Sequence, residues 1–286
     1  MNKINYDTFK IWVRDNIKSV LPPKYNDAEV EFRPVEKLGH TYMGMTVTLD
    51  PTEPTPTIDI DAMYARYRRG MNLDEILRDM KEIVEFKDPI TSKAELLNLV
   101  SDYETARKNM FIRVCDAQRE SSLLQKVPYK YESGLAITYH IYLNTGGDTF
   151  ASTQVTNELL EAFDVSQSKL HMDALISSAR NFPIKVDYLN PSDPDTFVIT
   201  NSRKNCGASA IFYPGAMDSL AEKYGETYYI LPVSVNEVVT LPERNLSSVS
   251  NMEWLVAKVN SYHRDKREIL SYRVFKYSIS GGFEKA

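Results

Sequence analysis

The sequence predicts an α+β protein in which helices and short strands follow one another irregularly. Apolar residues recur at three- and four-residue spacing in some segments and at two-residue spacing in others, and the two periods alternate in no regular order. The strand-like segments are short and bounded by Gly, Pro and Asn, which is typical of antiparallel pairing. We therefore expect an N-terminal unit of helix, hairpin and helices, followed by mixed elements with short, largely antiparallel strands.

The first 108 residues are expected to form the N-terminal α+β unit. A helix over 3–20 is ended by Pro22 and Pro23, and alternation within 29–33 and 43–49 predicts a hairpin. A short helix over 59–69 precedes a stronger one that begins after Asn72, with Glu75 placed to complete a capping box. A second capping-box pattern, at 92–95, opens a further helix through Tyr103.

Residues 109–286 are expected to form a second α+β domain, or to continue the first as one domain. The expected strands are 110–115, 136–143, 184–188, 197–200, 228–231, 235–241 and 272–279. The expected helices are 154–163, 167–180, 214–224 with Pro214 in its first turn, and one opened by a capping box at 250–253, with Leu255 among its inward residues.

Composition excludes several classes of protein. The 34 Lys and Arg against 39 Asp and Glu give a net charge of −5, and the basic residues are scattered, which argues against a nucleic-acid binder. Charged residues interrupt the N-terminal apolar run, and no stretch is apolar enough to span a membrane. With two cysteines in 286 residues a disulfide scaffold is excluded, so we expect a cytoplasmic protein.

Several strings resemble a bacterial family, domain of unknown function 5688. They are Asn205-Cys-Gly-Ala-Ser-Ala-Ile-Phe-Tyr-Pro-Gly215, Ala221-Glu-Lys-Tyr224, Tyr229-Ile-Leu-Pro-Val-Ser-Val-Asn-Glu-Val238, Leu21-Pro-Pro-Lys-Tyr25 and Pro56-Thr-Ile-Asp-Ile60. To a lesser degree the element order is similar to domain of unknown function 1444. The resemblance covers nearly the whole chain and implies a cytoplasmic bacterial protein, but it implies no activity, ligand or site residue.

No metal, phosphate-loop or serine-nucleophile motif is present, and we expect no cofactor, metal site or catalytic residue. One catalytic alternative stays open, beside a third hypothesis of an accessory or inhibitory protein whose acidic surface mimics nucleic acid. Cys206, in the turn Asn205–Ser209, would be the nucleophile of a hydrolase or transferase if the fold placed His140 or His171 beside it as a base. A buried or incidental cysteine is the favoured interpretation.

Tyrosine is the remaining compositional feature, with 18 Tyr against 11 Phe and 2 Trp. Core and sheet positions explain most of them, because the ring packs while the hydroxyl can stay solvated. The candidates for an exposed interaction face are Tyr64, Tyr67, Tyr129 and Tyr131. The leading hypothesis is a non-catalytic module that binds an unknown protein or small molecule.

Overall fold

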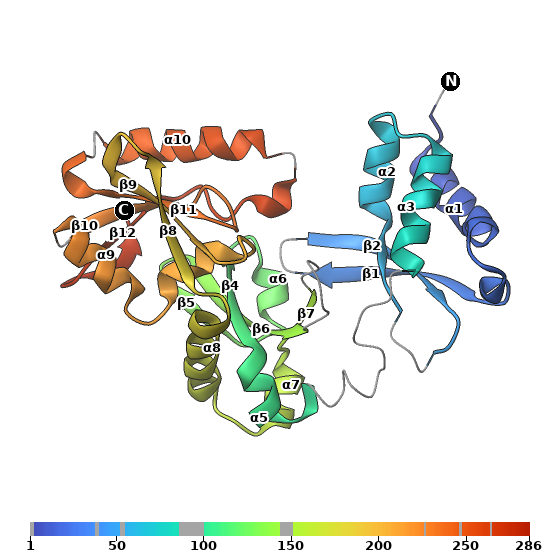
Figure 1. Cartoon of the computed structure of the whole chain (residues 1–286), viewed down its shortest axis with the longest axis horizontal. Helices are drawn as coiled ribbons and strands as arrows, with labels where there is room; N and C mark the ends of the chain where they lie inside the picture. The colour runs from blue at the N-terminus through green and yellow to red at the C-terminus, as the bar shows by residue number, and fades with distance from the viewer. Residues whose placement is uncertain are drawn as a thin grey trace. The chain divides into compact units, whose positions relative to one another are not determined.

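The structure is a computed structural model that describes residues 3–37, 40–51, 55–85, 100–143, 151–225, 227–245, 248–263 and 265–286. The described residues form two compact units, the first ending at Glu85 and the second beginning at Val100. Both units combine helices with antiparallel strands (Figure 1), which confirms the α+β class. The capping box at 92–95, the hairpin turn at 38–39 and the glycine turn at 144–148 lie outside the described residues.

In the first unit, three helices pack on a small antiparallel sheet. The strands are β1 (Glu29–Lys37), β2 (His40–Thr48) and β3 (Ile58–Asp59), in the order β1-β2-β3. The helices are α1 (Tyr6–Val20), α2 (Ile60–Arg68) and α3 (Leu73–Glu85). Phe9, Met45, Ile60 and Met80 are fully buried between them, which is the helix–hairpin–helix core that the two periodicities predict.

Two sheets organise the second unit. One contains β4 (Met110–Asp116), β6 (Leu135–Leu143) and β5 (Tyr129–Glu132) in that order, with β7 (Ala151–Gln154) also paired to β6. The other has the order β13-β12-β10-β11-β9-β8. Its strands are β8 (Ile184–Asn190), β9 (Asp193–Asn201), β10 (Thr227–Leu231), β11 (Val238–Pro242), β12 (Phe275–Ser278) and β13 (Gly282–Lys285).

Helices cover these sheets and close the core of the second unit. The longer ones are α7 (Asn157–Phe163), α8 (Gln167–Asn181), α9 (Ala216–Tyr224) and α10 (Val249–Tyr262), and the short ones are α5 (Tyr103–Ala106), α6 (Ser121–Leu124) and the 3₁₀ helix η3 (Gly207–Phe212). α8 lies along edge strand β4, where Ser178 Oγ accepts a hydrogen bond from Ile112 N at 2.9 Å. Among the described residues, no helix is long and apolar enough to cross a membrane.

Several boundaries differ from the sequence-based expectation. Residues 100–108, which the sequence groups with the first unit, belong to the second, because Tyr103 and Ala106 are buried in its core. α9 begins after Gly215, so Pro214 lies before its first turn. α10 is capped by Ser248 rather than Ser250.

Other differences concern side chains and strands. Leu255 is 41% exposed, although the helix opened at 250–253 was expected to bury it. The expected strand at 235–241 begins only at Val238, because Ser234 Oγ accepts hydrogen bonds from two following amides and holds the preceding residues in a turn. Tyr129 and Tyr131 lie in an additional strand, β5, just before the expected strand β6, and the end of the chain folds into two strands, β12 and β13.

Candidate functional site

The Cys206 thiol is buried at the start of η3, with 6% of the residue exposed. Sγ donates a hydrogen bond to Asn205 Oδ1 at 2.9 Å, and the backbone N–H donates to Asn236 Oδ1 at 2.9 Å. Burial raises the pKa of the thiol, and the nearby Arg113 guanidinium acts in the opposite direction. A thiol kept protonated by burial is a poor nucleophile, so the local chemistry favours a structural role for Cys206.

His140 lies near the same guanidinium but makes different contacts. It is 3% exposed on β6, its Nε2 is 3.1 Å from Thr138 Oγ1, and its ring packs at 5.4 Å from that of Phe111 on the paired strand β4. Burial lowers the pKa of His140 well below its usual value, and the Arg113 charge acts in the same direction. Arg113 thus acts on the pKa values of both Cys206 and His140, and its side chain also hydrogen-bonds the Cys206 thiol.

Acid is expected to destabilise the second unit through His140. The unfolded imidazole takes up a proton near pH 6.5, whereas the folded one resists protonation, so below that pH the unfolded state binds more protons. Stability is therefore full above about pH 6.5 and falls as the pH drops towards the lower folded pKa. We expect His140→Gln to flatten this dependence between about pH 6.5 and pH 5. Denaturant unfolding of both proteins across that range tests this, and parallel stability curves would contradict it.

His171 lies on α8 and belongs to a separate contact. Its Nδ1 is 3.2 Å from the hydroxyl of Tyr139, with ring centroids 5.9 Å apart. Tyr139 and His140 are consecutive residues of a strand, so their side chains leave opposite faces of the sheet. The two candidate histidines are therefore directed to opposite faces of the sheet and do not share one site.

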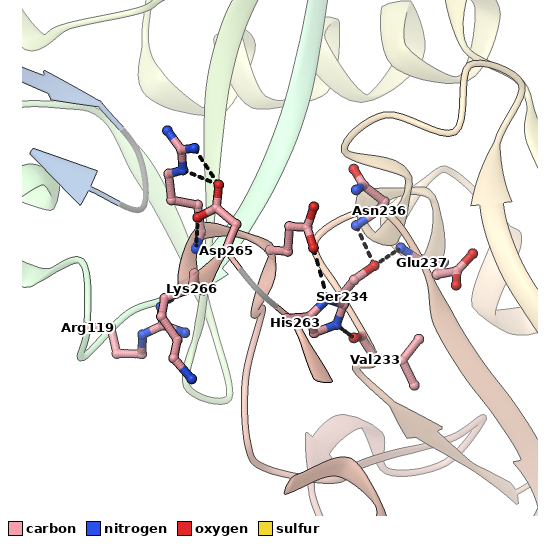
Figure 2. A network of polar contacts seen from close by, with 10 residues as sticks. Arg119, Val233, Ser234, Asn236, Glu237, His263, Asp265 and Lys266 are labelled. Atoms are coloured by element: carbon pink, nitrogen blue, oxygen red, sulfur yellow. Dashed lines mark hydrogen bonds and ion pairs between the residues drawn. The ribbon is translucent and has the colours of Figure 1, made fainter. Parts of the chain in front are cut away.

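The turn over residues 233–237 connects the Cys206 segment to the end of α10, and Figure 2 shows its contacts with Ser234 and His263. Ser234 Oγ accepts hydrogen bonds from Asn236 N at 3.0 Å and Glu237 N at 3.1 Å. Asn236 binds the Cys206 amide on one side, and on the other Val233 O accepts a hydrogen bond from His263 Nε2 at 2.6 Å. Two strings that carry the family resemblance, 205–215 and 229–238, therefore meet in one polar junction.

His263 closes this junction with both ring nitrogens. Nε2 faces the Val233 carbonyl, and Nδ1 lies 2.9 Å from Glu268 Oε2. A carbonyl and a carboxylate oxygen are both hydrogen-bond acceptors, so His263 has an acceptor beside each ring nitrogen. Val235 N also donates to Glu268 O at 2.8 Å, so the junction is held from both sides by the 3₁₀ turn η5 (Lys266–Glu268).

Tyr64 and Tyr67, on α2, make their contacts within the first unit. Both rings pack against Phe9, with centroids 5.3 and 5.6 Å away. Tyr64 donates a hydrogen bond to Ile4 O at 3.2 Å, and Tyr67 accepts one from Ile4 N at 3.1 Å. These contacts tie α2 to the start of α1, which is a structural role.

Tyr129 and Tyr131 line an open depression in the second unit with a volume of about 560 Å³. The depression lies between β5, the region of α6 and the segment before β12. Its lining residues are Ala117, Gln118, Ser121, Leu124, Gln125, Tyr129, Tyr131, Gly134 and Arg273. Tyr131 is 62% exposed, so an aromatic ring stands in solvent beside this depression.

Arg273 is the charged residue among those lining residues. Its Nη2 donates to Gln118 Oε1 at 3.0 Å, and its Nη1 lies 4.0 Å from Asp116 Oδ2. A Cβ at Gly134 would lie 2.6 Å from Nη1, so a glycine at this position leaves room for the guanidinium. Sequence reasoning singled out both tyrosines but missed Arg273, because it lies far along the chain and no local pattern distinguishes it.

Other chemistry is sparse in the described part of the chain. No three His, Cys, Asp or Glu side chains gather there as metal ligands. Asp59 and Asp61 would point to the same side if the backbone between them were extended. In the structure their carboxylates accept hydrogen bonds from Ala62 N and Met43 N respectively. The depression beside Tyr131 is thus the candidate binding site.

The chain matches the model of a family of unknown function, DUF5688, over residues 6–191 and again over residues 186–279. The two matches together run from α1 past the end of β12. Comparison with curated proteins and with solved structures gives no match.

Proposed function

The chain belongs to DUF5688, a family of unknown function, and we propose that it is a non-catalytic binding protein whose depression between β5 and Arg273 takes a carboxylate-bearing segment of a partner polypeptide. The observation that carries the proposal is the Arg273 guanidinium beside Tyr129 and Tyr131, in a depression without acidic lining residues. Because the chain has a net charge of −5, a depression lined by one positive charge and no negative charge differs in sign from the average surface. Arg and Tyr are also the residue types enriched where partners bind.

The electrostatics favour an anionic group on the ligand. A planar guanidinium binds carboxylates through paired hydrogen bonds, and Gln118 fixes the orientation of this one. Asp116 partly compensates the charge from 4.0 Å, but its Oδ1 is engaged by the amides of Gln118 and Arg119. The tyrosine rings supply the apolar area that a ligand side chain would cover.

The geometry of β5 favours an extended polypeptide. β5 pairs with β6, and in the described residues no strand pairs with its other edge. The Tyr129 carbonyl points towards that edge, since the Gln167 side chain of α8 donates to it at 2.7 Å. Tyr131, two residues on, presents its backbone in the same direction. An added strand would therefore find backbone partners beside the exposed Tyr131 ring.

The alternative of thiol catalysis receives less support. Burial raises the pKa of Cys206, its thiol hydrogen-bonds to Asn205, and His140 and His171 are engaged by Thr138 and Tyr139. Cys115 is also buried, and desolvation raises the pKa of its thiol to about 12. Both cysteines are free and buried, which supports our further proposal of a reducing cytoplasmic location in a bacterium.

Peptide selection tests the binding proposal. A phage-displayed library of random peptides is selected on the full chain, and the enriched peptides are synthesised and titrated by fluorescence anisotropy. We expect Asp or Glu to be enriched, and Arg273→Gln to weaken binding about 10- to 100-fold, because a hydrogen bond to a charged group is lost. Tyr131→Ala should also weaken binding.

Arg244→Gln is the matched control. Arg244 forms a surface ion pair with Asp195 at 2.9 Å, outside the depression, so its replacement should leave peptide affinity unchanged. Selected peptides that lack acidic residues, or that bind Arg273→Gln as well as the native chain, would refute the proposal. Failure of the library to yield any binder would also count against it.

A further inference from the structure

Strand β8 is an exposed edge strand with an apolar face. It ends the six-stranded sheet, pairs with β9, and all seven of its residues are exposed. Its exposed apolar side chains are Ile184 at 36%, Val186 at 41%, Tyr188 at 55% and Leu189 at 54%. An edge strand of this length and apolarity readily pairs with another chain unless something covers it.

The apolar face of β8 continues the core face of the sheet. Val186 pairs with Ile199 and Tyr188 with Phe197, and both β9 partners are buried. The rings of Tyr188 and Phe197 are 5.1 Å apart. The apolar face of the six-stranded sheet, which is buried at β9, therefore continues to β8 and is exposed to solvent there.

The opposite face of β8 carries one charge of each sign. Lys185 and Asp187 are two residues apart, and their Nζ and Oδ2 atoms are 3.0 Å apart. Their side chains are 46% and 52% exposed, so both charges remain accessible to a neighbouring strand. This pattern makes the strand complementary to a second copy of itself.

The charges select a single register for such a pairing. In an antiparallel pair of identical strands related by a twofold axis, residues that lie opposite each other have their side chains on the same face of the sheet. The twofold axis must therefore pass between the two copies of one residue, and not between two neighbouring positions. Centring on Val186 places each Lys185 opposite Asp187 of the other copy and each Ile184 opposite Tyr188. Moving the centre to a neighbouring residue would oppose two lysines or two aspartates, which is unfavourable.

We propose that the protein forms a symmetric dimer through β8, centred on Val186, in which the two six-stranded sheets become one continuous sheet. The second copy would pair the backbone edge, cover the exposed apolar side chains and form a ladder of four alternating charges. This inference is independent of the ligand proposed for the depression, which lies on another sheet.

Charge reversal tests the dimer on the full chain by sedimentation velocity and light scattering. Lys185→Asp and Asp187→Lys each create two like-charge pairs, and each should raise the dimer dissociation constant about tenfold or more. The double variant K185D/D187K restores both pairs and should dimerise as the native chain does. An equimolar mixture of the two single variants should form heterodimers, because each then offers the charge that the other lacks.

The mixture separates pairing between copies from the ion pair within one strand. Both single variants lose the internal pair, and mixing cannot restore it, so recovery of dimer on mixing requires contact between two β8 strands. Lys130→Asp on β5 is the matched control. Lys130 forms the same kind of internal pair with Glu132, at 2.7 Å on another edge strand, and its replacement should leave the dimer unchanged.

Three results would overturn the proposal: a native chain that stays monomeric at concentrations of hundreds of micromolar, a dimer that survives both single reversals, or a dimer dissociated by Lys130→Asp. If a reversal variant fails to fold, hydrogen exchange on the native chain decides. Amides of β8 should exchange more slowly at high protein concentration than at low concentration. Equal exchange at both concentrations would exclude pairing through β8.

Discussion

Replacement of Gly207 by alanine is expected to cost the second unit about 3 kcal/mol or more of unfolding free energy. A Cβ at this position would lie 2.2 Å from Thr200 Oγ1, 2.6 Å from Asn236 O and 2.7 Å from Asn201 N. Two of these atoms are backbone and cannot rotate away. Thr200 Oγ1 also donates to Asn236 O at 2.7 Å, so relief at one contact would break another.

Hydrogen exchange of the slowest amides in β9, β10 and β11 measures this loss, because it reports on the second unit alone. Gly215→Ala is the matched control. Gly215 has φ +74° and no atom within 4 Å of an added Cβ, so that variant should lose only about 1 kcal/mol through backbone strain. If Gly207→Ala costs no more than Gly215→Ala, the close approach of η3 to the 233–237 turn is not a tight contact.

The features that the sequence predicted best are those set by neighbouring residues. α1 begins and ends near its predicted limits, and its buried face is the periodic one. The capping box at the start of α3 is confirmed by two reciprocal hydrogen bonds of 2.9 Å, between Asn72 and Glu75. The hairpin of β1 and β2 follows from alternation alone. These interactions span a few residues, so their signal is contained in the local pattern.

Where two local solutions compete, tertiary packing decides between them. At α10 both Ser248 and Ser250 can cap a helix, and the pattern at 250–253 favours the second. In the structure Ser248 Oγ accepts from Asn251 N at 3.1 Å, and the helix buries Val256 against the six-stranded sheet while Leu255 faces outwards. The choice depends on the sheet that lies under the helix, which the helix sequence does not specify.

The candidate site was only half predictable for a related reason. Tyr129 and Tyr131 drew notice because aromatic residues concentrate in sheets and interfaces. Arg273 and Gln118 reach the same depression from other parts of the chain, and their meeting depends on how the loop before β12 lies against β5. Cys206 illustrates the converse, since the sequence favoured a buried cysteine while leaving a reactive thiol open, and the fold supplies the burial that raises the pKa of the thiol.

Replacement of Tyr228 by alanine is expected to cost about 3–5 kcal/mol, because a fully buried aromatic ring would leave a cavity. Its ring centroid lies 5.2 Å from that of Tyr224 and 5.8 Å from that of Tyr277. The three tyrosines therefore form one aromatic cluster that joins α9, β10 and β12. The Tyr228 hydroxyl reaches only Met217 O, at a long 3.3 Å. Tyr228→Phe keeps the ring and should cost about 1 kcal/mol or less.

The comparison of the two variants decides why this chain is rich in tyrosine. If ring packing is the reason, the alanine variant unfolds far more easily in denaturant than the phenylalanine variant, and Tyr262→Ala, at a position 72% exposed on α10, changes little. If Tyr228→Phe is instead as damaging as Tyr228→Ala, the hydroxyl carries the stability and the packing argument is wrong. The buried members of the set, which include Tyr139 and Tyr224, would then need to be explained by their hydrogen bonds to His171 and Thr240.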